Sequence, residues 1–247
     1  MLRIDVMGVG IDGLTMEQFT ARAAAILDRR ETACAVTPNA EILWEAMKNP
    51  GYREILNGAA LVLPDGAGVV LGAKMLGTPI PHKVAGIDFG QRICAILAGR
   101  GGRLFLLGGR PGVAAQAGAR LTERFPGLRI CGTADGYFPD DAAMAARIAQ
   151  TEPDAVFVCL GAPKQEIFMH RFGKATGARL LIGLGGSLDV YAGVQRRAPE
   201  WMISCNLEWF YRLLQDPSRF GRMLRLPKFV GSCLREQLRR KRKKWVN

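Results

Sequence analysis

The sequence predicts an α/β fold: a Rossmann-like parallel sheet with helices on both faces, followed by a basic, helical C-terminal appendage. Short apolar runs with strand composition alternate with amphipathic segments of about ten to fifteen residues, which is typical of βαβ units. Strand candidates such as Arg103–Leu107 and Ala155–Leu160 are almost continuously apolar, as a sheet covered on both faces requires. The composition, 49% hydrophobic and 23% charged, excludes a disordered or fibrous chain.

The predicted strands and helices alternate along most of the chain. The strands are Leu2–Met7, Ala33–Thr37, Ala60–Leu63, Arg103–Leu107, Arg129–Cys131, Ala155–Leu160 and Arg179–Ile182. The helices are Met16–Arg29, Ala40–Lys48, Phe89–Leu97, Val113–Phe125, Ala142–Thr151 and Gln165–Thr176. In such a fold, ligands bind outside the carboxyl ends of the strands, so the residues that follow each strand are the first candidates for a site.

The pattern changes near residue 196, which divides the chain into an α/β domain (residues 1–195) and an appendage (residues 196–247). After Pro199 we expect two or three helices, broken at Asp216–Pro217 and Leu226–Pro227 because proline does not continue a helix. The first of them, Trp201–Leu214, is apolar over most of its circumference. It must therefore pack against the body, a partner or lipid.

Positive charge is concentrated in the appendage. Of the net charge of +12, the appendage carries +10, from 14 Lys and Arg against four acids. It therefore predicts an anionic partner: phosphate-rich lipid, a phosphorylated substrate or nucleic acid. The basic run Arg239–Lys244 before Trp245 suits an anionic membrane surface, and the aromatic helices upstream favour lipid over nucleic acid.

Cysteine use and hydropathy limit where the protein works. The six cysteines lack the close pairs of a zinc site and most lie in apolar runs, which predicts buried, reduced thiols and a cytosolic protein. No signal peptide is predicted, because the first residues lack a basic segment followed by an apolar one. No stretch reaches the roughly 20 apolar residues of a spanning helix, so we expect any membrane contact to be peripheral.

A glycine motif near the start, Gly8–Gly13, matches the G-x-G-x-x-G pattern of dinucleotide-binding sites. Such a site also needs an acidic residue at the end of the second strand, for the ribose hydroxyls. Here that strand ends in Val36–Asn39, without an acid, and Asp12 would repel the phosphates. We therefore interpret the motif as a tight turn and keep an NAD-dependent oxidoreductase as an alternative function.

Later strand ends carry glycine and polar residues that suit a nucleotide. Gly108 and Gly109 precede a predicted helix, where backbone amides can approach a phosphate, although an ordinary βα turn explains them equally well. Gly161–Glu166 and Gly183–Asp189 add amide and ammonium groups at the same edge. Together these strand ends predict a nucleotide site.

Two earlier strand ends carry candidates for acid–base chemistry. Thr37–Asn39 and Pro64–Gly66 each end an apolar strand and open onto the carboxyl edge of the sheet. Asp65 has apolar neighbours in the sequence, which suits a general base; the alternative is an N-cap for a helix beginning near Gly68. The sequence shows no metal-binding pair of acids and no Ser-His-Asp arrangement, so we expect no metal and no cofactor.

Seven short motifs follow one another along the chain. They are Thr37–Glu41, Leu63–Gly66, Val84–Asp88, Leu107–Gly109, Gly136–Phe138, Gly161–Glu166 and Arg197–Pro199. In this order they resemble the WecG/TagA/CpsF glycosyltransferases (glycosyltransferase family 26). The resemblance implies inverting transfer of a sugar from UDP to an undecaprenyl-diphosphate-linked saccharide in bacterial surface polysaccharide synthesis. The sugars it implies are N-acetylmannosamine, its uronic acid or glucuronic acid.

The resemblance also implies roles for individual residues. Asp65 matches the general base, and Thr37 and Asn39 match residues that line the acceptor side. Lys83 stands where the family often has Arg, so a bidentate fork is lost, and whether this alters donor recognition stays open. The segments around UDP contain Gly108, Gly109, Tyr137, Gln165 and Asp189, and the arginines expected to close over the diphosphate are Arg212, Arg219 and Arg222.

The expected partners follow from the resemblance and the charge. They are a UDP-sugar donor, a polyprenyl-diphosphate-linked acceptor and the anionic inner, cytoplasmic face of the cell membrane. Without a metal, the basic appendage has to neutralise the departing UDP. We expect no nucleic acid partner, and keep a nucleic-acid-binding protein as the non-enzymatic alternative. The oligomeric state is left open, and one candidate is a homo-oligomer that buries the apolar appendage until lipid is present.

Overall fold

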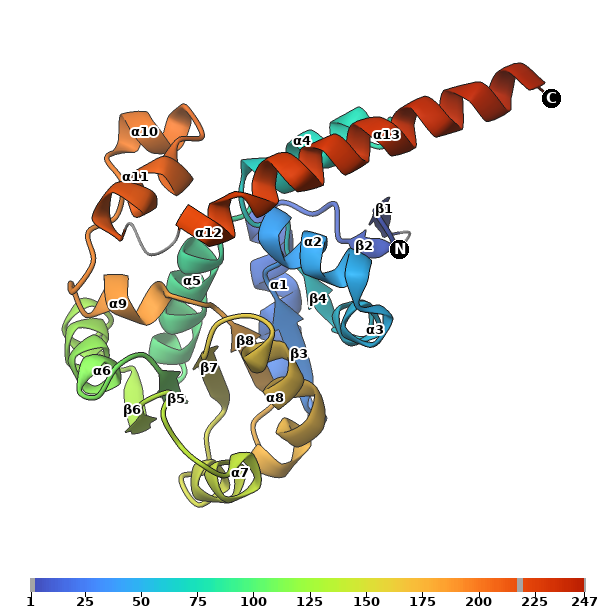
Figure 1. Cartoon of the computed structure of the whole chain (residues 1–247). Coiled ribbons are helices and arrows are strands. Elements are labelled where there is room, and N and C mark those ends of the chain that lie inside the picture. Colours follow the sequence, from blue (N-terminus) through green and yellow to red (C-terminus); the bar gives the residue numbers. More distant parts are fainter. Residues whose placement is uncertain (1–2, 217–219, 247) are drawn as a thin grey trace.

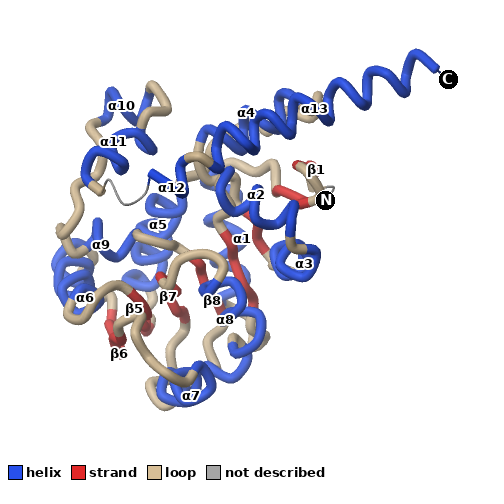
Figure 2. The backbone as a smooth tube through the Cα atoms, in the orientation of Figure 1, coloured by secondary structure: helices blue, strands red, loops and turns tan. Residues whose placement is uncertain are grey.

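The computed structural model describes residues 3–216 and 220–246 and is built around a parallel sheet of six strands (Figures 1 and 2). Its strand order is β4-β3-β8-β7-β5-β6. The strands are β3 (Ala33–Val36), β4 (Leu61–Val62), β5 (Arg103–Gly108), β6 (Arg129–Ala134), β7 (Ala155–Cys159) and β8 (Leu180–Gly183). The predicted α/β class is thereby confirmed.

Side chains of the strands alternate between two buried layers, one on each face of the sheet. On β5, Phe105 and Leu107 belong to one layer, and Leu104 and Leu106 belong to the other. The first layer is covered by α2 (Ala40–Lys48), α3 (Pro50–Asn57), α4 (Ala67–Met75), α7 (Asp141–Ala149) and α8 (Lys164–Phe172). The second is covered by α1 (Met16–Leu27), α5 (Gly86–Gly99), α6 (Val113–Arg124) and α9 (Ser187–Tyr191). Helices on both faces explain the continuous apolar strands.

The first predicted strand does not join this sheet. Instead, β1 (Ile4–Val6) pairs with β2 (Val9–Ile11) in a separate antiparallel hairpin. Met7 and Gly8 form its two-residue turn, and both have positive φ, 55° and 91°, which is the geometry that reverses a hairpin tightly. The turn interpretation of the glycine motif is confirmed, and the motif does not lead from a strand into a helix as a dinucleotide site requires.

Asp12, the residue that argued against a phosphate at the glycine motif, has a structural partner. Its carboxylate accepts a hydrogen bond from the Val62 amide at 2.8 Å and one from Arg3 Nε at 3.1 Å, while its own amide donates to the Val62 carbonyl. Asp12 thus pairs with β4, an outer strand of the sheet, and joins the hairpin to the body.

The appendage is helical, but its helices differ from the predicted ones. The predicted single helix Trp201–Leu214 is wrong: α10 (Glu200–Ser204) and α11 (Glu208–Gln215) are separated by a turn in which Asn206 has φ 60°. Asn tolerates this left-handed conformation, which cannot continue a helix. The break at Leu226–Pro227 is also displaced, because α12 (Phe220–Met223) ends earlier and α13 (Arg225–Val246) contains Pro227 in its first turn, where no helical hydrogen bond is lost.

The beginning of α13 is part of the protein core. Phe229 and Cys233 are fully buried and belong to the same apolar layer as α2 and α4. A Cβ atom on Gly72 of α4 would lie 2.8 Å from the Phe229 ring, so glycine lets the two helices approach closely. Figure 1 shows α13 crossing α4 here and then extending past the body.

Removing the buried Phe229 ring, which packs α13 onto the body, should destabilise the protein strongly. Phe229→Ala is expected to lower the free energy of unfolding by about 3–5 kcal/mol, because it removes a fully buried ring and leaves a cavity. The measurement is urea denaturation followed by circular dichroism. Leu238→Ala, on the same helix but 53% exposed, is the control and should change stability by less than about 0.5 kcal/mol. Equal stability of the two variants would contradict the docking of α13.

The surface of the appendage is unusually apolar. Within the described residues, eleven large apolar side chains are exposed and eight belong to the appendage: Trp201, Trp209, Phe210, Leu214, Phe220, Leu224, Leu234 and Leu238. The body does not shield these side chains, so of the three expected coverings of the first appendage helix, a partner or lipid is left for them. None of the described helices combines the length and the hydropathy needed to cross a bilayer.

Candidate active site

The predicted site residues of the α/β domain follow the carboxyl ends of the strands, so the order of the strands in the sheet sets the order of these residues along its edge. From one side to the other they are Asp65 after β4, Thr37 and Asn39 after β3, Asp189 on α9 after β8, Gln165 on α8 after β7, Gly108 and Gly109 at the end of β5, and Tyr137 after β6. The acceptor candidates therefore occupy one end of this edge and most of the nucleotide candidates occupy the other.

Backbone contacts hold the acceptor end together. The Asp65 amide donates to the Pro38 carbonyl at 3.2 Å, so the half-buried Asp65 lies beside the Thr37–Asn39 segment. The Val84 amide donates to the Pro64 carbonyl at 3.0 Å, which brings the segment of Lys83 to the same place. A general base and an acceptor-lining residue can act on one ligand only if their backbones lie close together. The two backbone hydrogen bonds hold the segments of Asp65, Thr37–Asn39 and Lys83 close together.

The local roles of the polar residues at this end can now be assigned. Asn39 is the N-cap of α2, where its Oδ1 accepts from the Ile42 amide at 3.0 Å. Gly66, with φ 87°, occupies the N-cap position of α4, so Asp65 precedes it and the alternative N-cap interpretation of Asp65 is wrong. Thr37 is buried and donates its hydroxyl to the Gly183 carbonyl at 2.7 Å.

At the nucleotide end, the backbone of β5 lies close to the backbone of β7 and of the loop after β6. Gly108, with φ 129°, has no room for a side chain, because a Cβ atom would collide with the Cys159 carbonyl oxygen. The Gly136 amide donates to the Gly109 carbonyl at 2.9 Å, and Lys164 Nζ donates to the Gly136 carbonyl at 3.1 Å. β5 and β7 are neighbours, yet the helices that follow them, α6 and α8, cover opposite faces of the sheet. Such a divergence opens the crevice in which α/β folds bind ligands.

Aromatic and cationic groups lie beside the ends of β5 and β7. Tyr137 is 72% exposed in the loop after β6, so its ring is available to a ligand. Lys164 lies over the ring of Phe138, with its Nζ 4.4 Å from the ring centre. This cation–π contact and the bond to Gly136 hold the ammonium group beside the start of α8.

Gln165 is buried rather than directed into open space. Its Oε1 accepts from the Gly185 amide at 3.0 Å and its Nε2 donates to Glu166 Oε1 at 2.7 Å. Tyr52 of α3 donates to the other Glu166 oxygen at 2.9 Å. Burial raises the pKa of Glu166 above its ordinary value of 4.5, and the hydrogen bonds from Gln165 and Tyr52 partly oppose that rise. Sequence analysis assigned Glu166 no role, because its partner Tyr52 lies 114 residues away.

The buried Glu166 should change how the free energy of unfolding depends on pH in the acidic range. Its folded-state pKa is higher than its unfolded one, so the folded state binds the proton more readily and gains stability as pH falls, whereas a Glu166→Gln variant has no such proton to bind. The difference in unfolding free energy between the wild type and Glu166→Gln is therefore expected to move in favour of the wild type as pH falls from neutral toward the ordinary glutamate pKa of 4.5. Parallel urea titrations at several pH values measure it. A difference that stays constant, or moves the other way, contradicts a raised pKa.

Two polar contacts join the appendage to the acceptor end. Arg197, where the appendage begins, forms a two-pronged ion pair with Asp88 of α5, at 2.6 and 2.7 Å. The hydrogen bond from Arg197 to Asp88 is the main cause that raises the pKa of Arg197. Lys83 Nζ donates to Asn206 Oδ1 at 3.1 Å, so Lys83 contacts the turn between α10 and α11. Asp88 and Arg197, which belong to two of the sequence motifs, thus join the appendage to α5. Only the three-dimensional structure reveals this role.

The three appendage arginines cannot be placed at the site. Arg219 lies outside the described residues, and the side chains of Arg212 and Arg222, on α11 and α12, do as well. Their predicted contact with a diphosphate stays a prediction. Within the described part of the chain, no three His, Cys, Asp or Glu side chains gather as potential metal ligands.

The cysteines do not contribute a nucleophile at this edge. All six are free thiols; Cys94, Cys159 and Cys233 are buried as predicted, whereas Cys205 is exposed. Burial raises the pKa of Cys94 to about 12 and that of Cys34 to about 11. Neither thiol therefore ionises near neutral pH.

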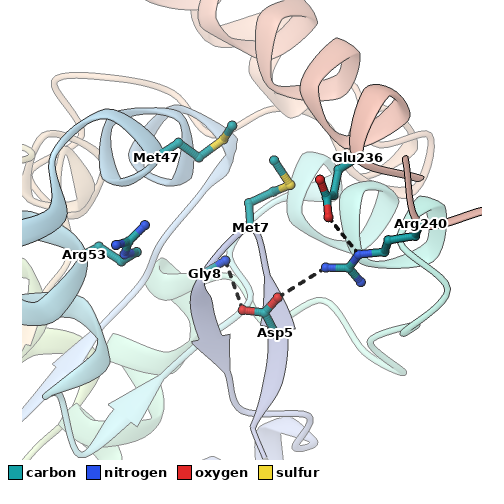
Figure 3. A pocket seen from close by; sticks show the side chains of 7 residues that line it. All are labelled: Asp5, Met7, Gly8, Met47, Arg53, Glu236 and Arg240. Atoms are coloured by element: carbon teal, nitrogen blue, oxygen red, sulfur yellow. Dashed lines mark hydrogen bonds and ion pairs between the residues drawn. The ribbon is translucent and has the colours of Figure 1, made fainter. Parts of the chain in front are cut away.

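A cavity of about 300 Å³ lies elsewhere, at the far end of α2 from Asn39 (Figure 3). Arg240 of α13 pairs there with Glu236 at 3.1 Å and with Asp5 of the hairpin at 3.7 Å. Its lining residues are Asp5, Met7, Gly8, Met47, Arg53, Glu236 and Arg240. It contains none of the predicted site residues, and it marks the contact between the hairpin and α13.

Comparison with known proteins matches this chain along nearly its whole length. A family model described as "Glycosyl transferase WecG/TagA/CpsF family" matches residues 4–243. A Bacillus spizizenii protein is 41% identical over 211 residues, which cover 85% of this chain and 82% of that protein. A Bacillus subtilis protein is 37% identical over 215 residues (87% and 84%), and one from Staphylococcus aureus is 32% identical over 231 residues (92% and 91%). All three are named N-acetylglucosaminyldiphosphoundecaprenol N-acetyl-beta-D-mannosaminyltransferase.

Proposed function

Because this chain belongs to the WecG/TagA/CpsF family of glycosyltransferases, we propose that it transfers N-acetylmannosamine from UDP to an undecaprenyl-diphosphate-linked saccharide. The names of its relatives favour this sugar over the uronic acids that sequence analysis kept open, and they favour N-acetylglucosamine as the acceptor sugar. The observation that carries the proposal is the order of residues along the carboxyl edge. Asp65 and Thr37 lie at one end, and Gly108 and Gly109 lie toward the other, so acceptor and donor can approach each other over β8.

Asp65 acts as the general base in this proposal. Its carboxylate takes the proton from the acceptor hydroxyl, and the oxygen then attacks the anomeric carbon of the donor as the bond to UDP breaks. UDP leaves with the bonding electron pair, and a single displacement of this kind inverts the anomeric configuration. Asp65 supports this role by its place, since its backbone is bonded to the segment of Thr37 and Asn39.

The negative charge that develops on UDP needs positively charged partners. We assign this to the appendage, whose first residues are held over the acceptor end by Arg197 and Lys83. Transfer is then independent of a divalent metal. The activity is expected to stay within about twofold when EDTA replaces added Mg²⁺, and loss of turnover in EDTA would count against this part of the proposal.

The appendage also serves as the membrane contact in this proposal. Exposed aromatic and leucine side chains on α10–α13 lie on a segment with a net charge of +10, a combination that suits the surface of an anionic bilayer. The enzyme would work at the cytoplasmic face, where UDP-sugars are available. The proposal leaves the oligomeric state as a separate question, to be measured by light scattering with and without lipid.

A thermal-shift titration separates the proposed function from its alternatives. UDP is expected to raise Tm, by mass action, whereas NAD should not. The NAD alternative is already weakened, because Gly8–Gly13 forms a hairpin turn instead of a strand-to-helix turn. Stabilisation by NAD alone would reverse this conclusion. An affinity for DNA that falls steeply with salt and far exceeds that for anionic vesicles would favour the nucleic-acid alternative.

A further inference from the structure

Glu166 is a buried carboxyl group that the proposed transfer step does not use. Only 1% of it is exposed, yet both of its oxygens accept hydrogen bonds, from Gln165 and from Tyr52. Burying a carboxylate is costly unless its oxygens are hydrogen-bonded. Its place in the first turn of α8 also favours a negative charge, because the helix dipole is positive there. The hydrogen bonds from Gln165 and Tyr52 thus give both Glu166 oxygens a fixed acceptor role inside the protein.

The direction of the Gln165 amide depends on this acceptor. The Gly185 amide can only donate, so it faces Gln165 Oε1, at 3.0 Å. Gln165 Nε2 then has to face Glu166, which accepts at 2.7 Å. A Cβ atom on Gly183 would lie 3.0 Å from Gln165 Nε2, so a side chain larger than glycine would press on this amide. Glu166 therefore fixes the orientation of Gln165.

The segment that Gln165 holds is the turn after β8, residues 184–186. Thr37 holds the residue just before this turn, by donating to the carbonyl of Gly183 at the end of β8, at 2.7 Å. The turn leads directly into α9, which carries Asp189. One turn therefore lies between the acceptor residues and the nucleotide residues, and it is clamped from both sides.

We propose that Glu166 is a positioning residue for the nucleotide: it orients Gln165, and Gln165 holds the turn after β8 in the geometry that receives UDP. This inference rests on the proposed function, because UDP is the ligand it concerns. Tyr52, which donates to Glu166 from α3, fixes the carboxylate in turn. The contribution of Glu166 is to binding, because the carboxylate is buried behind Gln165 and accepts its hydrogen bonds from Gln165 and Tyr52 rather than from the acceptor residues.

Calorimetric titration with UDP and steady-state kinetics test this role on the full-length protein. Glu166→Leu removes the acceptor, and it is expected to weaken UDP binding and raise the donor KM about tenfold, while kcat changes less than about threefold. Glu166→Gln should restore binding to within about threefold of the wild type. Its amide oxygen accepts from Gln165, and its amide group donates to the Tyr52 oxygen, so the hydrogen bond that orients Gln165 is kept.

A matched control separates positioning from stability. Ile148→Ala removes buried volume from α7 and should lower Tm by a similar amount without changing the affinity for UDP. If Glu166→Leu does not fold, Gln165→Met removes the same hydrogen bond together with the one from the Gly185 amide, and it is expected to weaken UDP binding at least as much. The proposal is overturned if the folded variant that lacks the bond binds UDP as tightly as the wild type, or if Glu166→Gln and Ile148→Ala lose as much affinity.

The outcomes also distinguish this inference from the proposed function. A wild-type protein that binds UDP and transfers sugar, together with a Glu166→Leu variant of unchanged UDP affinity, contradicts only the positioning role. A folded wild type that does not bind UDP contradicts both.

Discussion

Asp65→Asn is expected to lower sugar transfer about a thousandfold, which is within the range that a general base contributes. Asn has the same size but cannot accept the proton of the acceptor hydroxyl. UDP binding should stay within about twofold of the wild type, because Asp65 follows β4 and the proposed nucleotide site lies at β5 and β7. The measurements are initial rates of UDP release and calorimetric titration with UDP.

The control is Asp28→Asn, an exposed carboxylate at the end of α1 that pairs with Arg100 at 2.7 Å. It should transfer sugar at the wild-type rate. An Asp65→Asn variant with more than about a tenth of the wild-type turnover would remove Asp65 from the role of base. A variant that loses UDP binding as well would place Asp65 on the donor side instead.

Deleting residues 239–247 is expected to weaken binding to anionic vesicles about a hundredfold to a thousandfold at low ionic strength. The deletion removes the basic run Arg239–Lys244. Arg239 and Arg240 already pair with Glu236, at 2.8 and 3.1 Å, so the remaining four basic residues should account for most of the effect. The measurement is vesicle co-sedimentation at two salt concentrations, since added salt screens the attraction.

The position of the cut matters because α13 has two parts. A cut after Arg197 would remove the buried Phe229 and Cys233 and unfold part of the core, so it could not separate anchoring from stability. The deletion of 239–247 leaves both in place. As a control, uncharged vesicles should bind the two proteins equally. Unchanged binding to anionic vesicles would show that the exposed aromatic side chains of α10 and α11 suffice for membrane contact.

Sequence patterns predicted the sheet because most of its strands have apolar side chains at nearly every position and are also covered by helices on both faces. Ala155–Cys159 is buried at every position, so its apolar run could only be a strand covered on both faces. The first predicted strand is present as β1 but pairs in a hairpin instead of the parallel sheet, and the reason is local. The positive φ values of Met7 and Gly8 turn the chain back, and the glycine pattern alone does not show whether the turn leads to a helix or to a second strand.

The candidate site was predictable where its residues follow strands, because parallel strands bring their carboxyl ends to one edge. Asp65, Thr37 and Gly108 were found in this way. Contacts between distant segments were not predictable. Glu166 with Tyr52 and Arg197 with Asp88 are separated by more than a hundred residues, and no spacing rule links them. The division of the apolar segment at Asn206 depends on a left-handed residue that composition does not reveal.

The central claim is that this chain moves a sugar from UDP to a lipid-diphosphate-linked saccharide. The most direct measurement is UDP release by the full-length protein in detergent, with UDP-N-acetylmannosamine and N-acetylglucosaminyl-diphospho-undecaprenol. We expect release that requires both substrates and stops in Asp65→Asn, with a product one sugar longer. UDP-N-acetylmannosaminuronic acid and UDP-glucuronic acid serve as competing donors. Absence of acceptor-dependent release with all three donors, from a protein that is folded and in detergent, would contradict the account.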